Sequence, residues 1–234
     1  MQVETDSHLI RIDLHVHTAC SRDSLARPDA IVRWAERRSL DAIAVTDHNT
    51  IAGARTLQAL GALPLIVGEE VHTREGEIMG LFLREEIPAG LTPAETVRRI
   101  KAQGGLVCVP HPFDSVRGSR LSATALEAIL ADVDIIEVFN ARVTHARDNN
   151  RAADLAERRG LLAGAGSDAH AACEVGRAYV EMPPYADAES FLASLAQGRI
   201  GGSLSSPLVH VFSSVARLAK KVGLAEQVAG SDGR

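Results

Sequence analysis

Short apolar runs alternate with longer amphipathic stretches along most of this chain. Residues 9–14 alternate apolar and polar side chains with a period of two, which is typical of a strand. Pro28 then begins a stretch with apolar residues at helical spacing, since proline suits the first turn of a helix. Further strands are predicted at 41–45, 64–67, 77–83, 106–109, 133–139, 161–165 and 178–180. Further helices are predicted at 51–60, 122–131, 144–159 and 188–197, and one more begins after an N-cap at Thr92 and ends near Gly104.

The order of these elements indicates the fold class. Strands and helices in series predict parallel strands with right-handed crossovers, and about seven such units are enough to close a barrel. The 234 residues can bury one large core, and the sequence has neither an internal repeat nor a low-complexity linker. We therefore expect one α/β domain, although length alone would also fit two small domains.

The sequence after Pro207 has a different pattern. An apolar stripe at helical spacing leads into basic residues, and its members are Leu208, Val211 or Phe212, Val215, Leu218 and Val222. This stripe predicts a helix over 207–222 that packs across a face of the barrel, with a dimer contact or a membrane-surface helix as alternatives. Residues 225–234 are expected to form a loose tail.

Composition excludes several classes of protein. The chain is 46% hydrophobic and 24% charged, which excludes a disordered chain. No apolar run approaches the ~18 residues of a membrane span, and no secretory signal is visible. The three cysteines are odd in number and far apart, which fits reduced thiols in a cytoplasm. With a net charge of −5 and 3% aromatic residues, we expect a cytoplasmic enzyme that has neither a membrane nor a long nucleic acid as its partner.

Histidines and carboxylates gather where the predicted strands end. His15 and His17 are two residues apart at the end of the first strand, so their rings point to one face of it. The residues that follow later strands are His48, Glu69 and Glu70, His111, and Asp168 and His170. In a parallel barrel all these strand ends meet on one rim, where active sites are built. The sequence therefore predicts a metal site on that rim.

The residue types in this set indicate which ions it suits. Imidazoles and carboxylates without paired thiolates disfavour a structural four-cysteine zinc site and suit Zn, Mn or Fe. One ion takes about four to six ligands and the set is larger, so we expect two or three divalent ions bridged by a carboxylate. Such clusters are a common solution for phosphoester hydrolysis, because they hold both the attacking and the leaving oxygen.

The same motifs resemble those of a known family. They are His15-Val16-His17, Thr46-Asp47-His48, Gly68-Glu69-Glu70, Pro110-His111-Pro112 and Ser167-Asp168-Ala169-His170. In this order they resemble the PHP (polymerase and histidinol phosphatase) superfamily of metal-dependent phosphoesterases, over about residues 9–200 of the chain. The resemblance implies a distorted (β/α)7 barrel with up to three divalent metal ions at the carboxyl-terminal rim of its strands.

The resemblance also implies which residues bind each ion. The implied ligands are His15, His17, Glu70 and Asp168 for the first ion, Glu70 and His111 for the second, and His48 and His170 for the third. Asp23 matches an aspartate that the family uses after its first motif, and its other interpretation is an N-cap before the helix at Pro28. Glu137 or Asn140 falls at a further ligand position of some members, and Glu77 stands where some members have a histidine.

These features predict a metal-dependent phosphoesterase that hydrolyses a small phosphate ester, such as a nucleotide or a sugar phosphate. Hydroxide activated by the metal ions would attack phosphorus. Asp47 or His170 is the candidate acid that protonates the leaving oxygen. The alternatives are a metal-dependent amidohydrolase, because the same hydroxide can attack a carbonyl, and a nuclease or proofreading module of the PHP type.

The charge of a phosphate also calls for a cation that donates two hydrogen bonds, and arginine suits this role. The candidate substrate-binding residues are Arg142, Arg177 and Asn140. Arg117 and Arg120, in the loop after His111, are further candidates for the same role.

Overall fold

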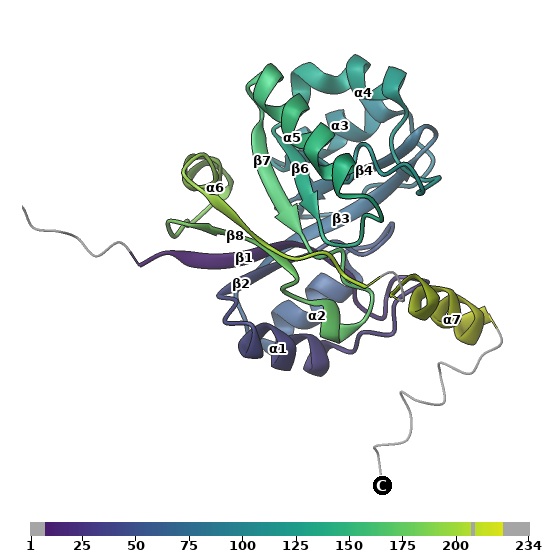
Figure 1. Cartoon of the computed structure of the whole chain (residues 1–234), viewed down its shortest axis with the longest axis vertical. Helices are drawn as coiled ribbons and strands as arrows, with labels where there is room; N and C mark the ends of the chain where they lie inside the picture. Colours follow the sequence, from purple (N-terminus) through teal and green to yellow (C-terminus); the bar gives the residue numbers. More distant parts are fainter. Residues whose placement is uncertain (1–7, 207–208, 222–234) are drawn as a thin grey trace, which may run out of the picture.

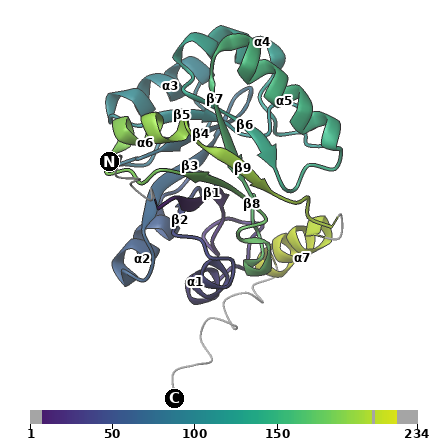
Figure 2. The ribbon, with the colours of Figure 1, turned by 60° about the vertical axis from the view of Figure 1, so that its left-hand side comes forward.

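The computed structural model describes residues 8–206 and 209–221 of the chain. The strands are β1 Ile10–Val16, β2 Ala42–Val45, β3 Leu65–Thr73, β4 Gly76–Leu81, β5 Leu106–Val109, β6 Ile135–Asn140, β7 Leu162–Gly166, β8 Ala178–Met182 and β9 Arg199–Gly202. The helices are α1 Pro28–Arg37, α2 Ala52–Leu60, α3 Pro93–Ala102, α4 Ala123–Ile129, α5 Ala146–Arg159, α6 Ala188–Leu195 and α7 Val209–Lys221. All the strands belong to one sheet, in the spatial order β7-β6-β5-β4-β3-β2-β1-β8-β9 (Figures 1 and 2).

Strands β1 to β7 curl into a nearly closed barrel-shaped sheet. β1, β2 and β3 run parallel, as do β5, β6 and β7, and β4 lies antiparallel between the two groups. The loop after β7 closes the sheet against β1, because His17 N donates to Ala169 O at 2.9 Å and Ala169 N donates to His15 O at 3.3 Å. Helices α1 and α2 lie at one end of the molecule and α3, α4 and α5 at the other (Figures 1 and 2). The expected α/β barrel is therefore confirmed.

The inside of the barrel is filled by side chains that alternate along each strand. On β3, Ile66 packs in the inner apolar cluster, whereas Val67 and Val71 pack in the cluster that includes the helices. The same alternation turns Glu70 inward, because it lies four positions after Ile66. Phe191 of α6 is fully buried in the inner cluster. Apolar residues thus fill the inside of the barrel, and polar side chains such as Glu70 lie further along the strands, toward their carboxyl ends.

The expectation of parallel strands is wrong for β4 and β8. β3 and β4 form an antiparallel hairpin that turns at residues 74–76, and a parallel crossover takes about a dozen residues or more. Gly76, with φ of 123°, permits this turn, and a Cβ there would lie 2.4 Å from Arg120 O. β8 pairs antiparallel with β1, and β9, which was not expected, pairs antiparallel with β8.

Two strands are longer than their sequence patterns predict. β1 continues to Val16 and β3 to Thr73, so His15 and Glu70 lie within strands rather than after them. The extension of β3 is held by β4, whose residues Glu77 and Met79 pair with His72 and Glu70. Sheet pairing therefore gives these side chains a rigid backbone support.

Helix α7 does not pack against the rest of the molecule through the expected apolar stripe. Val215 and Leu218 of the predicted stripe are 54% and 61% exposed, while Ser213 and Ala216 are buried. Polar contacts hold the helix instead: Arg142 Nη2 donates to Ser213 Oγ at 2.8 Å, and Lys220 Nζ donates to Ala19 O at 2.5 Å. The expected stripe residues Leu208 and Val222, and the tail 225–234, lie outside the described residues.

None of the described helices has the length and the apolar content that a bilayer span requires. Cys20, Cys108 and Cys173 are all unpaired, in agreement with the expected free thiols.

Candidate metal centre

The structure brings all eight predicted metal ligands into one cluster. They are His15, His17, Asp23, His48, Glu70, His111, Asp168 and His170, and each lies within 3.7 Å of another member. β1, β3 and the loops after β1, β2, β5 and β7 supply them. Residues as distant along the chain as His15 and His170 thus meet at the carboxyl ends of the parallel strands.

Glu70 lies at the centre of the cluster. Its Oε2 is 3.1 Å from His48 Nδ1, 3.4 Å from His17 Nε2 and 3.5 Å from His15 Nε2. Its Oε1 is 2.9 Å from His111 Nε2. One carboxylate therefore faces ring nitrogens on both of its oxygens, which is the arrangement of a bridging ligand.

Asp168 adds a second carboxylate to the same group. Its Oδ1 is 3.3 Å from His170 Nδ1, 3.5 Å from His17 Nε2 and 3.7 Å from His15 Nε2. Asp168 and His111 have φ values of 54° and 30°, which non-glycine residues rarely adopt. Such conformations cost about 1–3 kcal/mol each and are found at functional sites, where the surrounding structure holds them.

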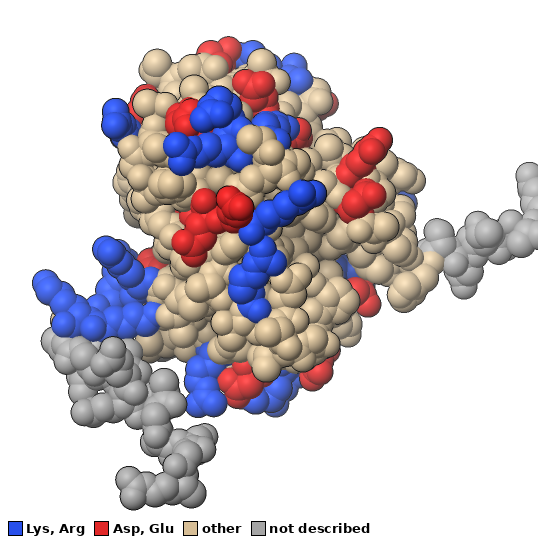
Figure 3. Space-filling model, turned by 180° about the vertical axis from the view of Figure 1, so that it is seen from behind, with Lys and Arg blue, Asp and Glu red and all other residues tan. Residues whose placement is uncertain are grey.

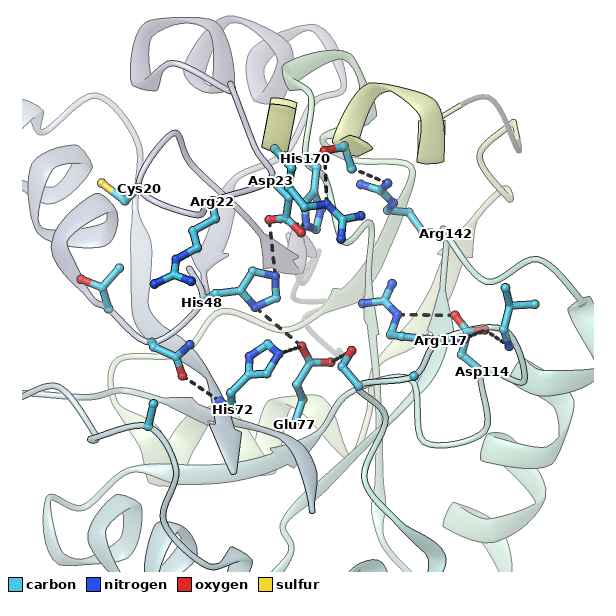
Figure 4. A pocket seen from close by; sticks show the side chains of 18 of the residues that line it. Cys20, Arg22, Asp23, His48, His72, Glu77, Asp114, Arg117, Arg142 and His170 are labelled. Carbon is cyan, nitrogen blue, oxygen red and sulfur yellow. Dashed lines mark hydrogen bonds and ion pairs between the residues drawn. The ribbon is translucent and has the colours of Figure 1, made fainter. Parts of the chain in front are cut away.

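Asp23, His48 and His170 form the third part of the cluster. Asp23 Oδ1 is 3.3 Å from His170 Nε2 and 3.6 Å from His48 Nε2, and the three side chains point toward one another (Figure 4). The ring nitrogens of His17, His48 and His170 lie within 4.8 Å of one another. Asp23 therefore faces the cluster, as the resemblance implied, and does not cap α1, whose N-cap is Arg27.

Glu77 extends the cluster on its β4 side. Its Oε1 is 3.2 Å from His72 Nε2 and 3.7 Å from His48 Nδ1, and its Oε2 is 3.7 Å from His111 Nε2. The resemblance marks Glu77 only as a departure from the family's pattern and gives it no place in the cluster. The signal that could have placed Glu77 was the period of two along β4, since Met79 lies on the same inner face.

The carboxylates of the cluster carry negative charge. Burial alone would raise the pKa of Glu70, but His15 and His48 hold that pKa well below its usual range. Burial opposes ionisation of Asp168 in the same way, and Arg117 together with His15 lowers its pKa well below the usual value. Both groups are therefore ionised at neutral pH and attract cations.

Two histidines are oriented by hydrogen-bond partners of the ring nitrogen that points away from the cluster. His15 Nδ1 lies 3.0 Å from Glu137 Oε1, so this nitrogen donates and Nε2 faces the cluster. Ser21 Oγ donates to Asp47 Oδ1 at 2.5 Å, so its lone pair accepts the proton of His17 Nδ1 at 3.0 Å. Both rings then direct Nε2 into the cluster, and partners of this kind orient ligands in metal sites.

The donor set fits divalent cations. Five buried atoms of the cluster have no hydrogen-bond partner in the described part of the chain: Asp23 Oδ1, His48 Nδ1, Glu70 Oε2, His111 Nδ1 and Asp168 Oδ1. Buried carboxylate oxygens of this kind are costly unless a cation or a donor satisfies them. Imidazoles and carboxylates suit Zn, Mn or Fe, as the sequence predicted.

Asp47 does not face the cavity, so the prediction that it protonates the leaving oxygen is wrong. Its Oδ1 accepts from Thr18 N at 2.7 Å as well as from Ser21 Oγ, and its Oδ2 accepts from Thr18 Oγ1 at 2.7 Å. Both oxygens are therefore engaged behind the cluster. Asp47 acts on His17 through Ser21 and is a positioning residue.

We expect Asp47→Asn to lower metal affinity or activity by about 10- to 100-fold, the range for partners that orient metal ligands. The amide weakens the bond from Ser21 and so releases His17 from its orientation. Metal titration monitored by calorimetry measures the change, and Asp154→Asn on the exposed face of α5 is the matched control. Equal affinities in the two variants would contradict the positioning role.

Asn140 also positions carboxylates. Its Nδ2 donates to Glu137 Oε2 at 2.9 Å and to Asp168 Oδ2 at 3.2 Å, and its Oδ1 accepts from Arg142 N at 2.8 Å. Glu137 in turn accepts from His111 N at 2.8 Å through Oε2. Asn140 is fully buried and its polar atoms are engaged, so the structure does not present it as the substrate contact that we expected.

The predicted arginines occupy different places. Arg142 lines the cavity beside the cluster, where its Nη1 is 3.5 Å from Glu174 Oε2. Arg177 is not among the residues that line this cavity, and Arg120 lines a separate cleft. Arg117 reaches the cluster itself: its Nη2 donates to Asp168 Oδ2, and its Nη1 is 3.0 Å from His111 Nε2. The loop between β5 and α4, rather than the one after β6, thus supplies the arginine nearest the expected ions.

The cluster lies at the bottom of a cavity of about 1000 Å³ (Figure 4). The cluster residues that line it include Asp23, His48, Glu77 and His170. Gly166 permits the close approach of β7 to β1 beneath them, because a Cβ there would lie 2.3 Å from His15 Cβ. The site is thus an open, polar cavity over a layer of buried histidines and carboxylates.

Two family models match the chain. The model described as PHP domain matches residues 13–105, and the model described as PHP-associated matches residues 146–200. An uncharacterized protein of Methanocaldococcus jannaschii, MJ1587, is 39% identical over 145 residues, which cover 56% of this chain and 82% of that protein.

Solved structures are similar in fold. One is a two-domain protein of Bacteroides vulgatus that contains a predicted PHP-like metal-dependent phosphoesterase, with a TM-score of 0.65 and 19% identity. The match covers 84% of this chain and 65% of that one, so this chain spans about two thirds of its length. Another is an amidohydrolase of Chromobacterium violaceum, with a TM-score of 0.54 and 18% identity, covering 87% of this chain and 96% of that one.

Proposed function

Because this chain belongs to the PHP domain family, we propose that it is a metal-dependent hydrolase of small phosphate esters. The proposed ligands of two or three divalent ions are His15, His17, Asp23, His48, Glu70, His111, Asp168 and His170, with Glu77 added from the structure. The proposed substrate is a nucleotide or a sugar phosphate.

The observation that carries this proposal is the position of Glu70 among overlapping ligand groups. Glu70 belongs to one group with His15 and His111, and His15 belongs to another with His17 and Asp168. Ligand groups that share members favour neighbouring ions, and ions about 3.5–4 Å apart are typical of phosphoester hydrolysis. When bound, divalent cations supply a nucleophile at neutral pH and draw charge from the phosphoryl oxygens.

Arg117 is the proposed phosphate-binding residue. Its side chain is only 18% exposed and reaches both Asp168 and His111, so its guanidinium lies at the layer of ligands. Burial alone would lower its pKa, but the charge of Asp168 raises that pKa above the usual value. A permanently charged group with two donor atoms in this place suits the oxygens of a phosphoryl group.

His170 is the proposed proton donor to the leaving oxygen when its ring is not bound to an ion. Its Nδ1 is 2.8 Å from the backbone oxygen of Asp168, and its ring lines the cavity. Asp47, the other candidate, is engaged behind the cluster. His170 is therefore the predicted acid that a substrate in the cavity can reach.

The proposal is tested by metal analysis of purified protein combined with a screen of phosphorylated metabolites and p-nitrophenyl phosphate. We expect bound Zn, Mn or Fe, phosphate release that stops after treatment with a chelator, and recovery when Mn²⁺ or Zn²⁺ is returned. Cleavage of an amide substrate by metal-loaded protein that releases no phosphate would instead establish the amidohydrolase alternative.

A further inference from the structure

The loop that carries Arg117, residues 110–122 between β5 and α4, is held by a buried carboxylate of its own. Asp114 Oδ1 accepts from Val116 N at 3.0 Å and from Arg117 N at 3.3 Å. Asp114 Oδ2 is 3.5 Å from Arg117 Nε, and the two side chains face each other (Figure 4). Asp114 thus fixes both the turn before Arg117 and one side of its guanidinium group.

The same turn is anchored to the first turn of α5 by Asp148. Its Oδ2 accepts from Ser115 N at 2.9 Å and from Ser115 Oγ at 2.8 Å. Ser115 lies inside the turn that Asp114 holds, two positions before Arg117. A shift of Ser115 would therefore move the backbone that carries Arg117, and Asp148 opposes this shift with two charge-assisted hydrogen bonds.

The residue after Asp148 connects α5 to the other side of the cluster. Asn149 Oδ1 accepts from Asn140 N, and Asn149 Nδ2 donates to Asn140 O, both at 3.1 Å. Asn140 Nδ2 in turn donates to Asp168 Oδ2, the oxygen that also accepts from Arg117 Nη2. Two adjacent residues of α5 therefore support two donors that converge on one carboxylate oxygen.

Burial distinguishes Asp114 and Asp148 from acidic residues on the surface. Acidic and basic side chains lie over the face of the molecule in Figure 3, where water screens their charges. Asp114 and Asp148 are only 3% and 2% exposed. Burial opposes ionisation of Asp148, but the two bonds from Ser115 lower its pKa below the usual value. A buried carboxylate is costly without partners, so the charge of Asp148 and the position of the loop depend on each other.

We propose that Asp148 is a positioning residue, which acts through Ser115 to hold Arg117 where it binds the phosphoryl group. This inference rests on the proposed function, because it concerns the phosphate-binding role of Arg117. Asp148 is buried behind the loop and is not among the residues that line the cavity. Its effect on the reaction therefore passes through Arg117.

The bonds that Asp148 accepts set the size of the expected effect. A hydrogen bond to a charged group is equivalent to about tenfold or more in an equilibrium constant. Asp148→Ala should therefore lower kcat/KM for phosphate esters by about tenfold or more, and Asp148→Asn by less, since its amide oxygen can still accept from Ser115. If Asp148 only stabilised the start of α5, its loss would act whether or not Arg117 is present.

The first test is a double-mutant cycle between Asp148 and Arg117, with kcat/KM for p-nitrophenyl phosphate measured on protein loaded with Mn²⁺. We expect Asp148→Ala to lower kcat/KM about tenfold or more when Arg117 is present, and to have no further effect in the Arg117→Ala protein. Metal content should be the same in all four proteins. Asp154→Ala, on the exposed face of α5, is the matched control and should keep full activity.

Two outcomes of this cycle would overturn the positioning role. One is an equal loss in both backgrounds, and the other is full activity of the folded Asp148→Ala protein. Circular dichroism shows whether the variants fold. If the alanine variant does not fold, Asp148→Asn takes its place in the cycle, with a smaller loss expected that again depends on Arg117.

The second test measures binding without hydrolysis. Methylphosphonate, whose carbon–phosphorus bond is not cleaved, is titrated calorimetrically into the same four metal-loaded proteins. Asp148→Ala should lower its affinity only where Arg117 is present. Hydrogen–deuterium exchange should also become faster over residues 115–117 in this variant, because Asp148 and Asp114 accept from their backbone amides.

The binding test separates the positioning role from the proposed function. If methylphosphonate binding shows this dependence on Arg117 while no phosphate ester is hydrolysed, the proposed function fails and the positioning role stands. If methylphosphonate binds equally well to the unsubstituted and Asp148→Ala proteins, or binds to neither, the positioning role is wrong.

Discussion

Replacing Glu70 with glutamine should lower the metal content of the protein and reduce phosphate release by more than about 100-fold, since loss of an outer partner alone costs 10- to 100-fold. The amide has the same size but no charge, and only one of its two ends can accept from a cation. Glu70 faces His48, His17 and His15 through one oxygen and His111 through the other. Its replacement therefore weakens every part of the cluster at once.

Metal analysis by mass spectrometry and phosphate release from p-nitrophenyl phosphate measure this effect. Glu157→Gln, on the exposed face of α5, is the matched control and should keep both metal and activity. Circular dichroism shows whether the Glu70 variant keeps its fold. A folded Glu70→Gln protein with full metal content and full activity would remove the basis of the proposed site.

Replacing Arg117 with alanine should lower kcat/KM for phosphate esters by about 10²–10³-fold, the range seen when one preorganised donor to a developing negative charge is removed. The guanidinium lies beside Asp168 and His111, where it would contact the phosphoryl oxygens. Arg117→Lys should restore only part of the activity, because an ammonium group lacks the planar pair of donors.

The readout that separates this role from metal binding is the metal content, which should stay unchanged in both Arg117 variants. Arg98→Ala is the control, since Arg98 forms an exposed pair with Glu95 on α3. If the Arg117→Ala protein lost its metal together with its activity, the residue would support the cluster rather than bind the substrate.

Local sequence patterns were sufficient for most of the strands and for the set of residues that the structure brings into the cluster. A strand turns alternate side chains to the same face whatever lies around it, so His15 and His17 could be assigned to one face from their spacing. The carboxyl ends of parallel strands meet at one rim. Because His111 and Asp168 each follow a strand, their positions predict that they lie near His15 and His17. The antiparallel β9 was missed, because its short sequence Arg199–Gly202 has two glycines and only one apolar residue.

The roles of polar residues near the site were harder to predict than the ligands. Asp47 and His48 are adjacent in one motif, yet His48 faces the cavity and Asp47 lies behind it. Arg142 and Arg117 both follow strands, yet Arg142 anchors α7 and Arg117 reaches Asp168. Such differences depend on loop conformation and on partners far away in the chain, which periodicity does not report.

The sequence by itself determined which residue types gather at the site, their order and the strands that carry them, because hydrophobic period and side-chain chemistry are local properties. Only the tertiary structure decided that β4 runs antiparallel, that Glu77 joins the cluster, and that Arg117 is the arginine nearest to it. It also decided that α7 stands at the mouth of the cavity through Ser213 and Lys220 rather than through its apolar stripe. These features arise from contacts between distant segments, whose energies depend on which surfaces meet when the sheet closes.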